Sequence, residues 1–367
     1  MKILILANND VGLYKFRREL IEALLAQMHD VVICLPYGDY VEELVALGCE
    51  FVACDLLERH GTNPLKEIKL IHFYKEVIKK IQPDIVFTYT IKPNVYGGIV
   101  CGQLKIPYVV NVTGLGTAVE NGGLMQKVTL TLYKLGLKRA QMVFFQNKEN
   151  QDYMLSHHVV KGAYGLLPGS GVNLERFPIL EYPDDSQVIR FAFISRIMKE
   201  KGIDQYLEAA TYIKKKYPNT EFHVCGFCES EYKGQLEELN EKGIVIYHGM
   251  IGDVSDFLKG IHCVVHPTYY PEGISNVLLE ACASGRPIIT TNRAGCKEVV
   301  EDGVNGYMIP QRDEKSLIEA IEKFLHLGVK ERKNMGLAAR KKVEQQFDRQ
   351  VVVEAYMREI AKVKEKW

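Results

Sequence analysis

Two glutamates, Glu272 and Glu280, stand in a segment whose pattern predicts a ligand site. The apolar run at 263–267 is rich in β-branched residues and predicts a buried strand of a parallel sheet. Ser275 stands where a helix N-cap is expected, ahead of the apolar residues 277–279. One carboxylate is therefore expected in a loop, and the other about one turn inside a helix.

The chemistry of this segment fits a sugar nucleotide. A helix N-terminus presents free backbone N–H groups and a partial positive charge, which suit a diphosphate. Glu280 can accept two hydrogen bonds, as a ribose diol requires, and Glu272 can do the same for sugar hydroxyls. Two glutamates alone are more often an ordinary loop acid and a solvated helix residue, so the pair needs independent support.

A second segment gives that support. Residues 190–195 predict a strand, and the loop that follows carries Arg196 and Lys201. Ligands of open α/β sheets bind at the carboxyl ends of strands. A guanidinium and an ammonium together can neutralise a diphosphate leaving group without a metal. The sequence also lacks a D-x-D metal motif, so we predict that these two cations clamp a diphosphate and that there is no metal site.

With these residues the sequence resembles glycosyltransferase family 4, the retaining nucleotide-sugar enzymes of the GT-B fold. The matching elements are Ser195-Arg196 with Lys201-Gly202, the Glu-x7-Glu element, a helix-to-strand turn at 281–289 and a later loop at 302–306. The likeness covers nearly the whole chain and is strongest from about residue 165 to 310. It implies that the Arg and Lys bind the donor phosphates, that the second Glu binds ribose, and that the first Glu and the backbone after it bind the donor sugar.

The expected donor site combines this resemblance with the positions of the predicted strand ends. A flexible Gly12 near a helix start, after the first strand, is expected to let the backbone approach a diphosphate, and uracil is expected to meet the backbone near Gly226 and near residues 249–251. The predicted catalytic residues are Arg196, Lys201 and Glu272. The predicted donor-binding residues are Gly12, Gly226, Met250, Gly273, Ile274, Ser275, Asn276, Val277 and Glu280.

The front half narrows the resemblance. Segments 14–17, 92–94, 113–116 and 171–174 look like the capsule, O-antigen and N-glycan assembly branch, which includes an N-acetylgalactosaminyltransferase acting on undecaprenyl-diphospho-bacillosamine. Members of that branch use UDP-sugars and polyprenyl-diphosphate-linked acceptors. The acceptor-binding residues expected on this basis are Arg17, Lys92 and Gly114.

Two questions stay open in this half. Arg17 is either a contact to the acceptor diphosphate or an ordinary helix-surface arginine. Several family members carry a His near the reacting carbon, whereas residues 88–92 of this chain contain none. We therefore assign no residue as a protein base.

Length and composition bound the other possibilities. The 367 residues fit two domains, and 46 basic against 46 acidic residues give no charge argument for nucleic acid. Nine cysteines scattered through apolar segments favour a reducing compartment, and Cys225 with Cys228 lacks the second pair that a zinc site needs. The start of the chain fits a first buried strand, not a signal peptide, and no apolar run is long enough to span a bilayer. These features predict a cytoplasmic protein.

Strands and amphipathic helices alternate along the chain, which predicts α/β domains with parallel sheets. By resemblance the fold class is GT-B, two Rossmann-like domains facing across a cleft. The predicted strands are 2–7, 31–35, 84–88, 108–112, 142–146, 190–195, 220–225, 244–247, 262–266 and 287–291. The predicted helices include 15–27, 66–81, 124–139, 329–346 and 348–366. The loop after the first strand lacks the G-x-G-x-x-G fingerprint, which weakens any NAD interpretation.

A stretch rich in Pro, Gly and Asp from residue 168 to 186 predicts the domain boundary. We expect an acceptor-binding domain at 1–168 and a nucleotide-sugar-binding domain at 169–347. By resemblance, the helix at 348–367 is expected to cross back to the first domain.

Two basic stretches, 66–80 and 124–139, fit either an interfacial helix on an anionic membrane or a solvated helix face. The second carries four cations and no acid, beside several apolar residues. The cations are Lys127, Lys134, Lys138 and Arg139. The lipid-linked acceptors of the resembling branch favour the membrane, at the inner face of the cell membrane.

The sequence thus predicts retaining transfer of a hexose or N-acetylhexosamine from a UDP-sugar to a polyprenyl-diphosphate-linked saccharide in surface glycan synthesis, with no cofactor beyond the UDP-sugar co-substrate. One alternative is a UDP-sugar 2-epimerase of the same architecture, which needs acid and base groups at C2. The other is an inactive homologue that serves as an assembly partner. The Glu-x7-Glu element argues against the first alternative, and the presence of all four site residues argues against the second.

Overall fold

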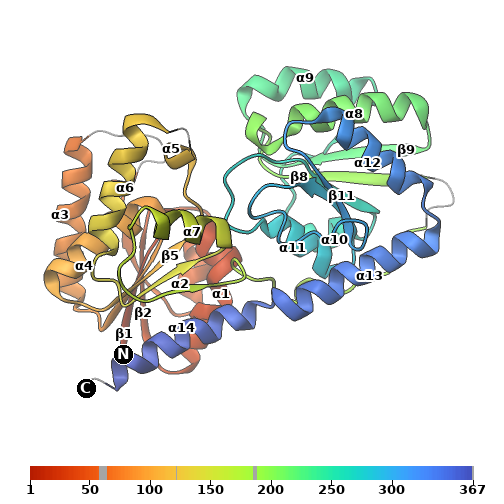
Figure 1. The fold of residues 1–367 in the computed structure, drawn as a ribbon. Helices are drawn as coiled ribbons and strands as arrows, with labels where there is room; N and C mark the ends of the chain where they lie inside the picture. The colour runs from red at the N-terminus through yellow and green to blue at the C-terminus, as the bar shows by residue number, and fades with distance from the viewer. Residues whose placement is uncertain (58–63, 121, 185–187, 366–367) are drawn as a thin grey trace. The chain divides into compact units, whose positions relative to one another are not determined.

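The chain folds into two compact units, shown in the computed structural model of Figure 1. Unit 1 contains Met1–Gly171 and Arg349–Trp367, and unit 2 contains Val172–Asp348. The structure describes residues 1–57, 64–120, 122–184 and 188–365. Each unit is built around one sheet whose strands all run parallel, so the predicted α/β class is confirmed.

Unit 1 has a seven-stranded sheet in the order β3-β2-β1-β4-β5-β6-β7. Its strands are β1 (Lys2–Leu6), β2 (Asp30–Leu35), β3 (Glu50–Ala53), β4 (Ile85–Tyr89), β5 (Tyr108–Val112), β6 (Met142–Phe145) and β7 (Tyr164–Leu166). The central strands are buried on both faces, because helices cover the sheet from both sides.

The helices of unit 1 form two layers on this sheet. They are α1 (Asp10–Ala26), α2 (Val41–Ala46), α3 (Pro64–Ile81), the π-helical turn η1 (Pro93–Gly97), α4 (Gly98–Leu104), α5 (Thr117–Glu120), α6 (Gly123–Leu137), α7 (Lys148–Ser156) and α14 (Arg349–Lys364). One core contains buried residues of α3, α4 and α6, and the other contains those of α1, α2 and α14. Tyr356 of α14 packs against Phe87 and Phe144 of the sheet.

Unit 2 has a six-stranded sheet in the order β10-β9-β8-β11-β12-β13. Its strands are β8 (Ile189–Ile194), β9 (Thr220–Cys225), β10 (Ile246–Tyr247), β11 (Cys263–His266), β12 (Ile288–Thr291) and β13 (Gly306–Ile309). Its helices are the 3-10 turn η2 (Lys199–Lys201), α8 (Ile203–Lys216), α9 (Ser230–Glu241), α10 (Val254–Leu258), α11 (Asn276–Ala283), α12 (Glu314–His326) and α13 (Val329–Gln346).

The predicted elements agree with the structure except at the sheet edges and at α1. Three strands escaped prediction, β3, β7 and β13, and β10 is shorter than predicted. All four lie at an edge of their sheet, where strands are short and partly exposed and so carry a weak apolar pattern. Helix α1 begins at Asp10, five residues before its predicted start, because Asn9 caps it.

The strand order places one reversal in each sheet. In unit 1 it lies between β1 and β4, and in unit 2 between β8 and β11. At such a point the connections leave the sheet in opposite directions, so their loops diverge and the carboxyl ends of two neighbouring strands stay accessible. None of the helices in the part of the chain that the structure describes is long and apolar enough to cross a membrane.

Candidate functional site

The candidate site of unit 2 lies at the reversal of strand order. Strands β8 and β11 are parallel neighbours, with Cys263 beside Phe191 and Val264 beside Ala192. Their carboxyl ends therefore meet at one edge of the sheet. The loop after β8 carries Arg196 and Lys201, and the loop after β11 carries Glu272.

The two loops meet in an ion pair between Lys201 and Glu272. The Lys201 ammonium donates a hydrogen bond to the Glu272 carboxylate. The two side chains are only 11% and 17% exposed, so little water screens the attraction between their charges. We call this a shielded pair, meaning that it is shielded from solvent. Removing one partner of such a pair leaves an uncompensated charge, which is far more costly than losing an exposed ion pair. The structure thus brings together two of the three residues predicted to be catalytic.

Tyr270 connects Arg196, the third residue predicted to be catalytic, to this ion pair. Its ring centroid lies 4.8 Å from the Lys201 ammonium nitrogen and 5.6 Å from the Arg196 guanidinium carbon. Both are cation–π distances. Arg196 is half-buried here and reaches the site from the start of the same loop. Tyr270 was not among the predicted site residues, although an aromatic residue two positions before the loop glutamate was a usable signal.

Gly202 allows the Lys201 loop to lie against the end of β11. Its φ is +80°, and a Cβ at this position would lie 2.1 Å from the Pro267 carbonyl oxygen. Two further bonds fix the loop, from the Tyr269 N–H to the Glu200 carbonyl and from the Thr268 hydroxyl to the same oxygen. Lys201 is therefore held by backbone contacts on both sides of its loop.

A loop after β12 supports Glu272 from behind. Gly295, at φ +88°, would place a Cβ 2.6 Å from the Gly273 carbonyl oxygen and 2.7 Å from the Glu272 Cβ. The Gly295 carbonyl accepts the Ser275 N–H at 2.8 Å, and the Gly295 N–H donates to Glu298 Oε2 at 2.7 Å. This segment was not among the predicted site residues, because it acts by packing against another loop.

Helix α11 begins directly after the loop that carries Glu272, as predicted. Ser275 occupies the N-cap position, but its side chain caps no backbone N–H. Ser275 and Ile274 are buried, so with Gly273 they present backbone more than side chain to the site. Asn276 and Val277 form the first turn and are half-buried, as is Glu280 in the second turn.

The first turn of α11, which the structure describes completely, contains no acidic residue. The partial positive charge of the helix end is therefore not neutralised by its own side chains. A diphosphate placed there would meet this charge together with Arg196 and Lys201.

The residues predicted to meet uracil lie in the loops that follow the neighbouring strands β9 and β10. Gly226 donates its N–H to the Gly249 carbonyl at 2.8 Å and accepts the Tyr247 hydroxyl at 3.2 Å. A Cβ at Gly226 would lie 1.8 Å from the Ser195 carbonyl oxygen, so this glycine also permits close packing of the loop after β8. Met250 is 70% exposed beside them.

In unit 1 the structure contradicts the flexible loop expected at Gly12, while the role of Gly12 in donor binding stays a prediction. Gly12 is not in a flexible loop: it lies in the first turn of α1, where its N–H donates to the Asn9 side chain at 2.7 Å. Asp10 also stands in that first turn and accepts the Tyr40 N–H at 2.7 Å. The end of α1 already has a capping side chain and a carboxylate, which removes the physical reason for a diphosphate there.

The predicted acceptor residues lie at the carboxyl edge of the same sheet. Arg17 is buried, with its guanidinium carbon 4.9 Å from the centre of the Tyr89 ring, so its alternative as a helix-surface arginine is wrong. Lys92 forms an ion pair with Glu67 at 2.8 Å. Gly114 follows β5 with a φ of +155°. Whether these residues bind an acceptor stays a prediction.

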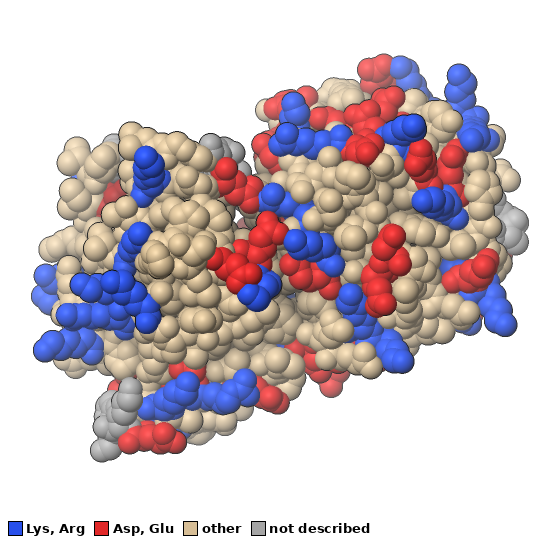
Figure 2. Space-filling model, in the orientation of Figure 1, with Lys and Arg blue, Asp and Glu red and all other residues tan. Residues whose placement is uncertain are grey.

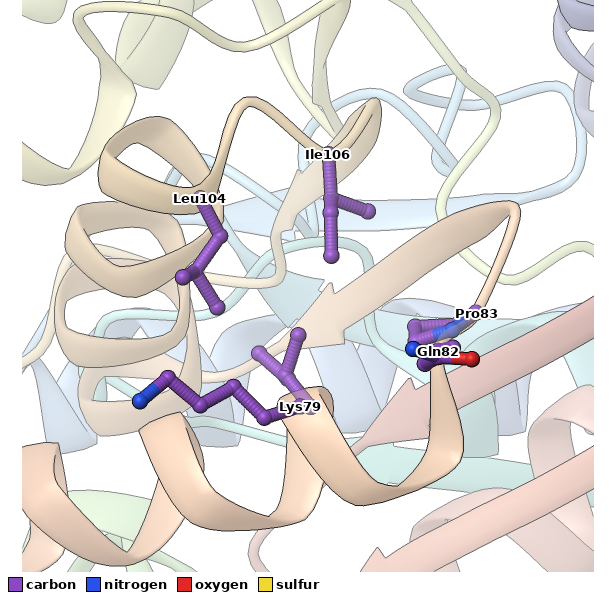
Figure 3. Close-up of a pocket in the computed structure, with 6 residues that line it drawn as sticks. Lys79, Gln82, Pro83, Leu104 and Ile106 are labelled. Carbon is purple, nitrogen blue, oxygen red and sulfur yellow. The ribbon is translucent and has the colours of Figure 1, made fainter.

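A surface hollow of unit 1 lies apart from these residues. The hollow measures about 460 Å³ and is lined by Ile78, Lys79, Gln82, Pro83, Leu104 and Ile106 (Figure 3). Pro83 precedes β4, so the hollow lies at the amino edge of the sheet, opposite to where ligands of such sheets bind.

No group of three or more His, Cys, Asp or Glu side chains arranged to hold a metal occurs among the residues that the structure describes.

Comparison with known families matches both halves of the chain. Residues 2–147 match the family described as glycosyl transferase 4-like, and residues 176–342 match glycosyl transferases group 1. The chain is 27% identical, over 98% of both sequences, to the Campylobacter jejuni N,N'-diacetylbacillosaminyl-diphospho-undecaprenol alpha-1,3-N-acetylgalactosaminyltransferase. It is 26% identical to the Escherichia coli UDP-Gal:alpha-D-GlcNAc-diphosphoundecaprenol alpha-1,3-galactosyltransferase, over 78% of this chain and 76% of that one.

Solved structures show the same fold. Anabaena HepE in complex with UDP superposes with a TM-score of 0.80 at 16% identity, covering 99% of this chain and all of that one. A Rickettsia africae glycosyltransferase superposes with a TM-score of 0.81 at 17% identity, covering 100% and 99%. With its two parallel sheets the chain therefore has the predicted GT-B fold.

We expect Gly202→Ala to destabilise unit 2 more than a matched control, Gly303→Ala. Both glycines have nearly the same positive φ, +80° and +75°, so an alanine meets similar backbone strain at either site. Only at Gly202 does the new Cβ collide with a backbone oxygen, whereas Gly303 faces open space. An overpacking cost of about 2 kcal/mol corresponds to an extra drop in melting temperature of roughly 4–8 °C. Equal melting temperatures for the two variants would contradict this account of the loop.

Proposed function

The chain belongs to glycosyltransferase family 4, and on that premise we propose that it moves a hexose or an N-acetylhexosamine from a UDP-sugar to a polyprenyl-diphosphate-linked saccharide, with retention of anomeric configuration. The observation that carries this proposal is the shielded Lys201–Glu272 pair beside the N-terminus of α11, whose first turn contains no acidic residue. It combines a cation for phosphate, a carboxylate for sugar hydroxyls and a helix end for a diphosphate.

Binding of the donor would exchange the partners of this pair. Lys201 and Arg196 turn to the diphosphate oxygens, and the Glu272 carboxylate turns to the hydroxyls of the donor sugar. Glu280, half-buried in the second turn of α11, accepts hydrogen bonds from the ribose diol. The UDP named for the Escherichia coli relative and for the HepE complex supports the choice of nucleotide.

The same groups then stabilise the reaction. As the bond between sugar C1 and the phosphate oxygen breaks, negative charge grows on the leaving diphosphate, and the two cations and the helix end oppose it. The acceptor hydroxyl attacks C1 on the face that the diphosphate leaves, and its proton passes to a phosphate oxygen. This step needs neither a carboxylate nucleophile nor a protein base, and the two cations take the charge-stabilising role of a metal in this proposal.

The acceptor assignment rests on unit 1 and on the relatives. Both relatives described above are named for undecaprenol-linked diphosphate acceptors. Arg17, buried against the Tyr89 ring near the strand-order reversal of its sheet, is the cation that we assign to the acceptor diphosphate. A lipid-linked acceptor keeps its diphosphate at a membrane surface, so the enzyme must reach that surface.

Helix α6 offers a face for this contact. Its solvent-exposed apolar residues are Leu124, Met125, Val128 and Leu135. Lys127, Lys134 and Lys138 are exposed at helical spacing beside them, and Figure 2 shows basic side chains gathered over this part of unit 1. Apolar residues flanked by cations suit an interfacial helix on an anionic membrane, here the inner face of the cell membrane. Arg139 differs, because its guanidinium donates to the Gly102 carbonyl at 2.8 Å and so holds α4.

The two alternatives predict different behaviour. A UDP-sugar 2-epimerase would convert a UDP-sugar without any acceptor, and an inactive homologue would bind UDP-sugar weakly or convert none. The relatives named above are transferases, and Arg196, Lys201, Glu272 and Glu280 are all present. Incubation with UDP-N-acetylglucosamine alone separates the first alternative from transfer.

The decisive experiment is transfer from a panel of UDP-sugars to undecaprenyl-diphosphate-linked sugars, with EDTA in the buffer. We expect one donor to be used despite the chelator. Arg196→Ala and Lys201→Ala should each lower turnover about a hundredfold, or roughly 3 kcal/mol, because each removes a cation from the developing charge. Lys199→Ala is the matched control, an exposed cation of the same loop, and should retain turnover. Activity that needs added manganese or magnesium, or full activity of Lys201→Ala, would contradict the proposal.

The two glutamates should separate in a binding experiment. Glu280→Ala should weaken binding of UDP itself, because the ribose is common to UDP and to every donor. Glu272→Ala should leave UDP affinity little changed but lower turnover and weaken discrimination between sugars. Calorimetry with UDP on both variants distinguishes these roles. Equal loss of UDP affinity in both would show that the division is wrong.

Membrane contact through α6 should depend on its lysines. We expect the triple variant Lys127→Gln, Lys134→Gln, Lys138→Gln to bind anionic liposomes less tightly and to use the lipid-linked acceptor more slowly. Each cation near an anionic surface contributes about 1 kcal/mol, screened by salt. Slow hydrolysis of UDP-sugar without acceptor should be unchanged, because it needs only the site of unit 2.

The matched control carries the same charge change on α13 of unit 2, at three exposed lysines. Its substitutions are Lys330→Gln, Lys333→Gln and Lys341→Gln. It should bind liposomes as tightly as the unmodified protein. Should the two triple variants bind alike, the contact lies elsewhere on the molecule.

A further inference from the structure

His266, the last residue of β11, has a buried ring whose Nε2 lies 4.0 Å from the Glu272 carboxylate of the Lys201–Glu272 pair. Its side chain is 1% exposed, and neither ring nitrogen has a hydrogen-bond partner among the residues that the structure describes. Leaving a buried polar group without a partner costs roughly 1–3 kcal/mol, so such groups usually have a reason to exist. From the sequence, this residue was predicted only to be part of a strand.

The surroundings of His266 point its ring at Glu272. Nε2 of the ring lies 4.0 Å from Glu272 Oε1, which is about 1 Å too long for a hydrogen bond. The Phe193 ring of β8 packs beside it, and the Thr290 hydroxyl of β12 donates to its carbonyl at 2.8 Å. The histidine is therefore fixed by the sheet, while Glu272 lies in a loop.

The ring is kept neutral by its environment. Burial lowers the pKa of His266 well below its usual range, and the nearby Lys201 ammonium lowers it further. The Glu272 carboxylate is the negative charge that lies near the same ring. A neutral imidazole carries one N–H donor, which suits a carboxylate acceptor without adding a charge to the core.

We propose that His266 is a positioning residue that takes over Glu272 when Lys201 leaves it. On donor binding Lys201 turns to the diphosphate, and the Glu272 carboxylate loses this ion pair. A shift of about 1 Å then lets Nε2–H of His266 donate to one carboxylate oxygen. The other oxygen stays free for the hydroxyls of the donor sugar. The inference rests on the proposed function for its trigger, but the contact itself needs only the loss of the Lys201 cation.

A ligand-free experiment tests the contact directly. Lys201→Met removes the competing cation, so the proposed bond between His266 and Glu272 should form without any donor. His266→Leu should then lower the melting temperature by about 2–4 °C more in the Lys201→Met background than in the unmodified protein, the shift expected for a bond of about 1 kcal/mol. An equal shift in both backgrounds would overturn the proposal.

Kinetics give a second test, with Lys201 intact, in case Lys201→Met does not fold. His266→Leu should lower kcat by roughly tenfold to a hundredfold with UDP affinity unchanged, the range expected for a hydrogen bond to a charged group. His266→Gln keeps an N–H donor on the side chain and should restore most of kcat. In a Glu272→Gln background, His266→Leu should cost far less than it does alone. If Leu and Gln at residue 266 lower kcat equally, or the effects of His266→Leu and Glu272→Gln simply add, the residue is only structural.

The two tests separate this inference from the proposed function. A protein that transfers no sugar from any UDP-sugar would refute the function, while the unfolding cycle would still decide whether His266 can hold Glu272. If the protein transfers sugar but the effects of His266→Leu and Glu272→Gln on kcat simply add, the proposed function is supported and the role of His266 is refuted.

Discussion

A shielded ion pair at a reversal of strand order is the constraint on which the site of unit 2 depends. Lys201 and Glu272 reach each other because the strands that precede them, β8 and β11, are neighbours in the sheet. In the chain, β8 and β11 are separated by β9 and β10, which lie on the other side of β8. Burying either charge without the other would be costly, so each stabilises the other in this position. In the proposed function, a donor that carries an anion beside hydroxyl groups would replace both partners of this ion pair at once.

Close backbone contacts make that arrangement possible. Gly202, Gly226 and Gly295 each stand where a Cβ would lie within 2.6 Å of a carbonyl oxygen of another loop. They join the loops after β8, β9, β11 and β12 into one packed edge, and each combines that contact with a positive φ. The charged residues are therefore positioned by backbone packing more than by side-chain bonds, and a fixed His266 at the end of β11 fits the same scheme.

The sequence was most informative where a residue acts through its own chemistry. Strands buried on both faces are continuous apolar runs, so the centres of both sheets were predictable, and cations or carboxylates after such runs identified Arg196, Lys201 and Glu272. The edge strands β3, β7 and β13 were not predictable, because their partial exposure weakens the pattern. Gly295 and Tyr270 were missed because their roles depend on neighbours that only the folded chain provides.

Comparison of the two reversals shows why the fold alone does not place the anion. In unit 1 the helix that follows the first strand is α1, whose N-terminus is capped by Asn9 and carries Asp10 in its first turn. In unit 2 the helix after β11 is α11, whose first turn contains no acid and whose N-cap side chain bonds no backbone N–H. The dipole of α1 is already satisfied by a carboxylate, whereas that of α11 is not. The side chains of a single helical turn, and not the topology of the sheet, therefore set the charge that each of these two helix ends presents.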